Sequence, residues 1–387
     1  MKSTYNNTVT EKIQKTAEAY IDDIILASDP LYPVWNRESI IFAKQPKWNY
    51  IDNSIIKALT MLYELTGDNR LIDYSVKFID SYVSEDGEIP TMNVKDYNLD
   101  NVNGGKNLIY LYRKTGNEKY RTAFEKVYSQ LETQPRLTCG NFWHKIIYPN
   151  QVWLDGVYMA MPFMAEYADL VGNSKIHEDI LRQTGNIMYL MRDNKTGLYF
   201  HGYDETHSMH WADPSTGLSG EFWLRSMGWL SAGLVDICDA VGSSNPLYGF
   251  CGRMLSNLLE SLAVYADSDG TFYQLPAKAY LERNYTETSG TLLFAYSAMK
   301  SARLGITGGN IRQCGFRAFS SVTEKYVHFS DGIPILENIC LVAGLGGSQK
   351  RDGSEKYYLN EKITQNDAKG IAPYLMAYCE YKWLIHG

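Results

Sequence analysis

Glycine recurs at the points where one amphipathic helical pattern ends and the next begins. These glycines are Gly67, Gly116, Gly172, Gly242 and Gly305. A glycine just past the last helical residue readily takes the left-handed conformation that caps a helix. Because a second amphipathic stretch follows each one within a few residues, each glycine predicts the tight turn of a helical hairpin. The chain is therefore constrained to fold as a series of antiparallel helix pairs.

Counting the apolar periodicity along the 387 residues gives twelve helices in six pairs. The expected helices are 8–28, 50–66, 69–83, 101–115, 118–132, 155–171, 175–192, 222–241, 246–266, 287–304, 308–325 and 369–385. No Pro/Ser-rich or charge-rich linker divides the chain, so one large domain over residues 1–387 is expected. This pattern predicts an all-α fold, an (α/α)6 barrel.

The links between the expected helices alternate between short glycine turns and long loops. The long loops are 29–49, 84–100, 133–154, 193–221, 267–286 and 326–368. Antiparallel hairpins place all of these long loops on one face, and binding sites are usually built from loops that a rigid scaffold supports. We therefore expect the functional site at the face that carries the long loops.

Charge and cysteine content exclude several classes of function. The net charge is −7 and no run of Lys or Arg stands out, which argues against nucleic acid or an anionic membrane surface as partner. The six cysteines form no Cys-x-x-Cys pair, so neither a zinc knuckle nor a redox motif is indicated. The first ten residues are polar and no stretch is long enough to span a bilayer, so a cytoplasmic protein is expected, as a monomer or weak homo-oligomer.

Asp155 is the leading candidate for a catalytic group. It lies among aromatic and apolar residues at the start of the 155–171 helix, where burial would raise its pKa as a general acid requires. The alternative is an aspartate that interacts with the helix dipole. Other polar or aromatic residues stand at the ends of the long loops, and each also has a structural explanation: Asp100 as a helix cap, His144 as a hydrogen-bonded loop histidine and Arg225 as partner of a structural carboxylate. Together they outline a saccharide-binding cleft with aromatic walls.

Several segments, in order along most of the chain, resemble the unsaturated rhamnogalacturonyl hydrolases of glycoside hydrolase family 105, relatives of the unsaturated glucuronyl hydrolases of family 88. They are 47–50 (KWNY), 98–100 (NLD) with Lys106, 151–156 (QVWLDG), 159–163 (MAMPF), 199–204 (YFHGYD), 222–229 (FWLRSMGW) and 287–291 (ETSGT). The resemblance implies an (α/α)6 barrel with Asp155 as catalytic acid and base and Asp100 as the second carboxylate. It also implies a sugar site lined by Tyr50, His144, Trp223, Arg225 and Trp229. One departure is Leu224, which stands where glycine is expected, on the leaving-group side of the site.

The implied activity is hydration of the C4=C5 double bond at the non-reducing end of an unsaturated uronyl oligosaccharide, which then releases 5-keto-4-deoxyuronate. Unsaturated galacturonyl-rhamnose from pectin is the first choice of substrate, and neither a metal nor an organic cofactor is implied. Three alternatives remain open at this point. They are a sugar 2-epimerase using His144, His201, His207 or His210, a conventional inverting glycosidase on the same barrel, and a non-catalytic helical-repeat binding protein.

Overall fold

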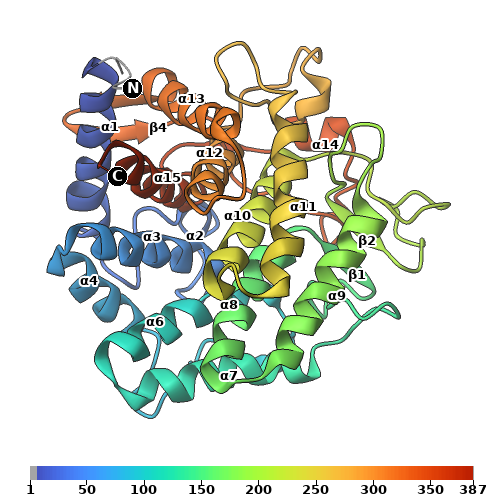
Figure 1. Ribbon diagram of the computed structural model, residues 1–387, viewed down its shortest axis with the longest axis horizontal. Helices are drawn as coiled ribbons and strands as arrows, with labels where there is room; N and C mark the ends of the chain where they lie inside the picture. The colour runs from blue at the N-terminus through green and yellow to red at the C-terminus, as the bar shows by residue number, and fades with distance from the viewer. Residues whose placement is uncertain (1–6, 387) are drawn as a thin grey trace.

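Two concentric rings of helices make up the structure, a computed structural model that describes residues 7–386 (Figure 1). The inner ring consists of α3 (Tyr50–Thr66), α6 (Gly105–Thr115), α8 (Asp155–Val171), α10 (Leu224–Val241), α12 (Thr288–Arg303) and α15 (Ala368–His386). The outer ring consists of α1 (Asn7–Ala19), α4 (Asn69–Asp80), α7 (Glu118–Thr133), α9 (Ser174–Met191), α11 (Pro246–Ala263) and α13 (Gly309–Tyr326).

The inner ring is closed. Each inner helix packs on the next one along the chain, and the last, α15, packs on the first, α3. In Figure 1 the chain runs once around the barrel, so that the red C-terminal helix lies beside the blue N-terminal ones. The predicted (α/α)6 barrel is therefore confirmed.

Burial separates the inner helices from the outer ones. Nearly every residue of α10 and α12 is buried, whereas outer helices such as α4 bury one face only. Glycine permits the close approach of the inner helices: a Cβ atom on Gly233 of α10 would lie 2.9 Å from the backbone nitrogen of Tyr158 in α8. The hydrophobic core fills the space between the two rings.

The five glycine turns are confirmed. Gly67, Gly116, Gly172, Gly242 and Gly305 all have positive φ, between 67° and 74°. Each joins the end of an inner helix to the start of an outer one. The long loops consequently lie at the opposite end of the barrel, where the inner helices begin.

The predicted 101–115 helix is divided in the structure. A short helix, α5 (Leu99–Val102), precedes α6, and the turn between them contains Gly104. A Cβ atom on Gly104 would collide with the Trp48 ring, so the turn depends on a close tertiary contact rather than on local preference. Likewise the expected 8–28 helix is α1 followed by a π-helical segment, η1 (Tyr20–Ile25).

The long loops also contain short elements that periodicity did not predict. They are α2 (Arg37–Ile41), η2 (Val94–Asp96), η3 (Pro276–Lys278), α14 (Glu355–Asn360), and the paired strands β1 (Gln151–Trp153) with β2 (Gly202–Asp204), β3 (Val327–Ser330) with β4 (Ile333–Leu336), and β5 (Ile339–Cys340) with β6 (Ile363–Thr364). Residues 1–6 and 387 of the expected single domain, and with them most of the polar N-terminal segment, lie outside the described residues. No helix within 7–386 combines the length and apolarity needed to cross a membrane.

Candidate active site

The β1–β2 ribbon positions Asp155 at the mouth of the barrel. Trp153 pairs with Gly202, and the backbone N–H of Leu154 donates to the carbonyl of His201 at 3.1 Å. Helix α8 begins at Asp155, directly after this ribbon. Two residues distant in sequence, Asp155 and His201, are thereby brought side by side.

The Asp155 carboxylate is held by a buried histidine. His201 is fully buried, its Nε2 lies 3.4 Å from Asp155 Oδ2, and its Nδ1 lies 2.7 Å from the Tyr358 hydroxyl. The expectation that the pKa of Asp155 is raised overall is wrong. Burial does raise it, but the neighbouring His201, together with the charge that His144 carries when protonated, outweighs burial, so the pKa lies below its usual value.

Asp100 is the second carboxylate at this end of the barrel. It lies in the first turn of α5, whose cap is Asn98: the side-chain oxygen of Asn98 accepts from the Asp100 N–H at 3.1 Å. The Asp100 side chain is therefore not the helix cap. It accepts a 2.5 Å hydrogen bond from Lys145 Nζ and lies 3.5 Å from Nε2 of His144.

His144 connects the two carboxylates through Trp153. It is buried and stacks on the Trp153 ring at 4.6 Å, while His201 contacts the same ring at 5.5 Å. Burial lowers the pKa of His144 to about 4, although Asp100 opposes the change, so its imidazole is neutral near pH 7. Asp100 and Asp155 thus each lie beside a histidine that contacts the same tryptophan.

Trp223 and Arg225 stand at the start of α10, next to His201. Trp223 contacts His201 at 4.7 Å, and the Arg225 guanidinium lies 4.9 Å from the Trp223 ring centre. Arg225 is buried and lies 3.8 Å from Glu287, and its Nη1 donates to Ser289 Oγ at 3.2 Å and to the Cys340 carbonyl. Among the described residues, its Nε has no acceptor. Arg225 therefore has a structural carboxylate partner and one donor left unused.

Tyr50 and Trp229 complete the set of predicted residues. The Tyr50 ring meets the Trp229 ring edge-on at 6.1 Å. Burial and the charges of Asp100 and Glu38 raise the pKa of Tyr50, and the charges of Arg225 and Asp155 also act on its hydroxyl. Tyr50 is therefore close enough to Asp100, Asp155 and Arg225 for their charges to act on it, and Trp229 joins the set through its contact with Tyr50.

Leu224 does not face this centre. It is fully buried, and a Cβ atom on Gly290 of α12 would lie 2.5 Å from its Cγ. The leucine that departs from the family pattern is thus packed between α10 and α12, with Gly290 providing the space.

Sequence reasoning assigned no role to three residues near the two aspartates, Trp153, Lys145 and Tyr358, and considered His201 only for the epimerase alternative. Trp153 and His201 stand in the quoted 151–156 and 199–204 segments, so the resemblance carried a signal for them. Lys145 directly follows His144, but Tyr358 lies in α14, which no pattern predicted. Of the other histidines considered, His210 is exposed and His207 half-buried on the loop after β2.

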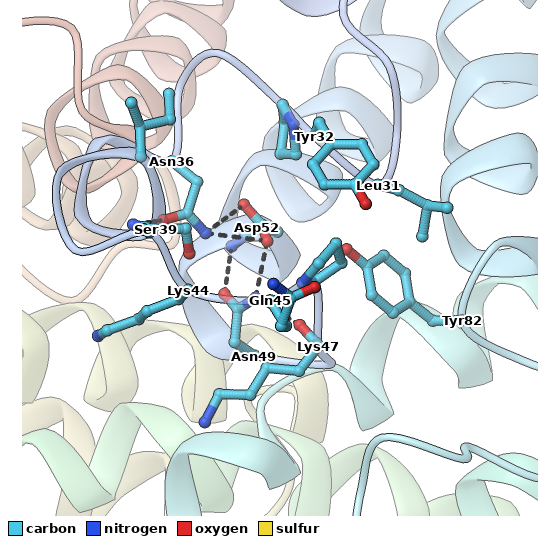
Figure 2. Close-up of a pocket in the computed structure, with 14 residues that line it drawn as sticks. Leu31, Tyr32, Asn36, Ser39, Lys44, Gln45, Lys47, Asn49, Asp52 and Tyr82 are labelled. Carbon is cyan, nitrogen blue, oxygen red and sulfur yellow. Dashed lines mark hydrogen bonds between the residues drawn. The ribbon is translucent and has the colours of Figure 1, made fainter.

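A hollow of about 310 Å³ lies beside the site in the 31–52 region, which Figure 2 shows. At its centre Asp52 accepts hydrogen bonds from Asn36 and Asn49, which Figure 2 shows, and a further one from Trp35. Burial, outweighing these hydrogen bonds, raises the pKa of Asp52 to about 6. Since Asp52 is fully engaged by its own loop, we interpret it as the anchor that fixes the start of α3, and with it Tyr50.

A second hollow, of about 280 Å³, opens next to the paired aromatic rings. Tyr148 lines it and stacks on Trp153 at 4.6 Å, and Arg351 donates to the Tyr148 hydroxyl at 2.8 Å. Lys44 and Gln349 complete its rim from two other long loops. Tyr148 therefore lies between this hollow and the Trp153 ring on which it stacks.

Comparisons with known proteins agree with this geometry. The sequence model of Glycosyl Hydrolase Family 88 matches residues 32–384. A family 105 glycoside hydrolase structure from C. acetobutylicum ATCC 824 is 34% identical, with a TM-score of 0.88 over 96% of this chain and 99% of that one. The unsaturated rhamnogalacturonyl hydrolase YesR of Bacillus subtilis is 25% identical over 263 residues, 66% of this chain and 72% of its own. Protein Atu3128 of Agrobacterium fabrum is 35% identical over 229 residues, 57% of this chain and 97% of its own. The chain therefore belongs to the glycoside hydrolases of families 88 and 105 and is a glycosidase.

Proposed function

We propose that this glycosidase hydrates the C4=C5 double bond of an unsaturated uronyl oligosaccharide, with Asp155 as acid and then base, and that residues 1–387 act as one catalytic domain. The observation that carries the proposal is the pair of aspartates that each lie beside a buried histidine in contact with Trp153. The names of relatives support the substrate class, because YesR is an unsaturated rhamnogalacturonyl hydrolase.

The reaction begins with proton transfer from Asp155 to C4 of the substrate. The double bond is a vinyl ether, so the cation that forms at C5 is stabilised by the ring oxygen. The Asp155 carboxylate then removes a proton from the water that attacks C5, and a hemiketal results. Opening of the C5–O5 bond leaves a ketone at C5 and a hemiacetal at C1, which releases the remaining saccharide as an alcohol.

The His201–Tyr358 pair suits both states of Asp155. When Asp155 is protonated, it can donate to Nε2 of His201, whose Nδ1–H then donates to the tyrosine oxygen. When Asp155 is ionised, the Tyr358 hydroxyl can donate to Nδ1 and the Nε2–H to the carboxylate. A tautomer change in His201 therefore accompanies the change of role from acid to base.

The substrate itself supplies the conditions that protonate Asp155. The surrounding protein lowers its pKa, but a uronate carboxylate bound nearby adds a negative charge that favours the neutral acid. Lys145 and Arg225 place positive charge at the same end of the barrel, where they can hold the uronate.

The linkage and the rest of the saccharide decide the preferred substrate. Galacturonyl and glucuronyl residues differ at C4, and the double bond removes that stereocentre. We therefore infer that selection acts on the anomeric bond and on the sugar that fills the hollow beside Tyr148. Unsaturated galacturonyl-rhamnose remains the first candidate, which would place the enzyme in pectin breakdown inside the cytoplasm.

The test is loss of the ultraviolet absorbance of the conjugated double bond. Unsaturated galacturonyl-rhamnose, an unsaturated glucuronyl disaccharide and their saturated counterparts form the panel. Asp155→Asn should lower kcat by at least ~10³-fold, since one group serves both proton-transfer steps. Asp73→Asn, an exposed aspartate on α4, is the matched control and should keep full activity. Cleavage of the saturated sugars alone would instead identify a conventional inverting glycosidase.

A further inference from the structure

Apart from the two hollows described above, a cavity of about 310 Å³ lies inside the barrel at the end that carries the glycine turns; we call it the second cavity. Residues from five inner helices line it, mostly from the halves where those helices end. Its volume is at the lower limit of pockets that hold small molecules, which begin at roughly 300 Å³. None of the seven predicted site residues lines it, and it shares no lining residue with the two hollows described above. The Tyr158 ring, which Lys106 contacts at 3.8 Å, packs on Trp229 at 4.7 Å.

Most of the charged groups around this cavity have partners. Lys300 Nζ donates to Asp236 Oδ1 at 2.7 Å and lies 2.9 Å from Asp239, and Arg113 lies 3.6 Å from Glu166. The charges within each of these pairs compensate one another, so none of these groups requires a ligand as counter-ion.

Lys106 is the exception. It is 2% exposed, and its Nζ lies 3.8 Å from the centre of the Tyr158 ring but has no hydrogen-bond acceptor within residues 7–386. Lys57, from the facing helix α3, adds a second ammonium for which that part of the chain provides no ion pair, and its charge acts on Lys106. Buried cations are normally paired, because an isolated ammonium is costly to remove from water.

The wall opposite these lysines offers an unused acceptor. Asp236 is buried, and its Oδ1 is engaged by Lys300 and Tyr296, whereas Oδ2 has no donor among the described residues. Lys300 and the two unpaired lysines outweigh burial and keep the pKa of Asp236 below its usual value. The carboxylate is therefore ionised and can accept one more hydrogen bond.

We propose that this cavity is a second binding site, for a small anion that also carries a hydroxyl group. The anionic group is held by Lys106 and Lys57, and the hydroxyl donates to Asp236 Oδ2. A carboxylate and a phosphate would both satisfy the lysines, so the shared requirement is the negative charge next to a hydroxyl. This site is independent of the chemistry proposed for Asp155.

Titration calorimetry on the full-length protein tests the proposal with three probes. Lactate represents hydroxycarboxylates, glycerol 3-phosphate represents hydroxylated phosphates, and propionate is lactate without its hydroxyl. At least one of the two hydroxylated probes should bind saturably at pH 6.5, and if lactate binds, propionate should bind more weakly. Lys106→Met should weaken binding about tenfold or more, as expected for loss of a charge-assisted hydrogen bond.

Two controls locate the bound probe. Lys114→Met removes an exposed lysine of the same helix, which is paired with Glu64, and should leave binding within a factor of two. Arg225→Met changes the site at the mouth and should also leave it unaffected. If Lys106→Met does not fold, the half-buried Lys57→Met takes its place. The proposal is overturned if no probe binds saturably. It is also overturned if Arg225→Met abolishes binding while Lys106→Met or Lys57→Met retains it.

Discussion

Replacing Lys106 with methionine should stabilise the ligand-free protein. Burial lowers the pKa of Lys106 from 10.5 to about 7, despite the opposing charge of Asp236. Each pKa unit corresponds to about 1.36 kcal/mol, so the buried ammonium costs the folded state roughly 5 kcal/mol at a pH below 7. Methionine keeps the apolar stem but loses the cation–π contact with Tyr158, worth ~1–2 kcal/mol. We therefore expect the free energy of unfolding at pH 6 to rise by at least ~2 kcal/mol.

The pH dependence gives this prediction a definite sign. Lys106 titrates near 10.5 in the unfolded chain and near 7 in the folded protein. Between these values the unfolded chain binds more protons, so raising the pH stabilises the wild-type protein. The advantage of Lys106→Met should therefore be largest at pH 6 and shrink progressively toward pH 10.

Urea unfolding of both proteins, followed by tryptophan fluorescence at pH 6 and pH 9, measures this difference. Lys114→Met serves as the matched control and should stay within ~0.5 kcal/mol of wild type, as is usual for an exposed position. A Lys106→Met protein that is less stable than wild type at pH 6, or a difference that does not change with pH, would show that Lys106 is charged and satisfied within the protein.

Three further predictions concern the mouth of the barrel and the turns. Asp100→Asn leaves Lys145 without its counter-ion, so KM should rise. The basic limb of the kcat–pH profile, which reports loss of the Asp155 proton, should move to lower pH because a negative charge near Asp155 is lost. If the limb does not move, the role of Asp100 is limited to substrate binding. His201→Gln removes the main group that lowers the pKa of Asp155, so the same limb should move to higher pH, and a shift in the other direction would exclude His201 as its hydrogen-bond partner. Gly116→Ala should cost ~1 kcal/mol in thermal unfolding and leave kcat/KM unchanged, because φ is +67° and no atom lies within 4 Å of the added Cβ.

The helices could be predicted because their signals are local. Apolar periodicity and a glycine cap each depend on a few neighbouring residues, and the 155–171 helix was predicted with both ends correct. The alternation of short turns and long loops then placed the site at one end of the barrel without any knowledge of tertiary contacts. The division between α5 and α6 could not be found in this way, because it depends on the approach of Gly104 to Trp48.

The pKa of Asp155 shows what cannot be inferred from neighbouring residues in the sequence. Its apolar neighbours in the sequence correctly indicated burial, but the group that determines its pKa is His201, 46 positions later. The two meet only because β1 pairs with β2, three residues on each side. Strands this short carry almost no periodic signal, so neither the ribbon nor the resulting pKa was accessible from sequence pattern.

The direction of the inner helices bears on both ends of the barrel. All six begin at the mouth and end at the glycine turns or, for α15, at the C-terminal end of the described chain. Their positive dipole ends therefore point toward the proposed uronate site, and the negative ends of the five helices that line the second cavity lie on its side of the barrel. Arg113 and Lys300 lie in the last turns of α6 and α12, where a negative dipole end favours a cation. Lys106 is the second residue of α6, so the dipole of its own helix disfavours its charge. The helix ends therefore explain Arg113 and Lys300 but not Lys106, whose ammonium has no hydrogen-bond acceptor among the described residues.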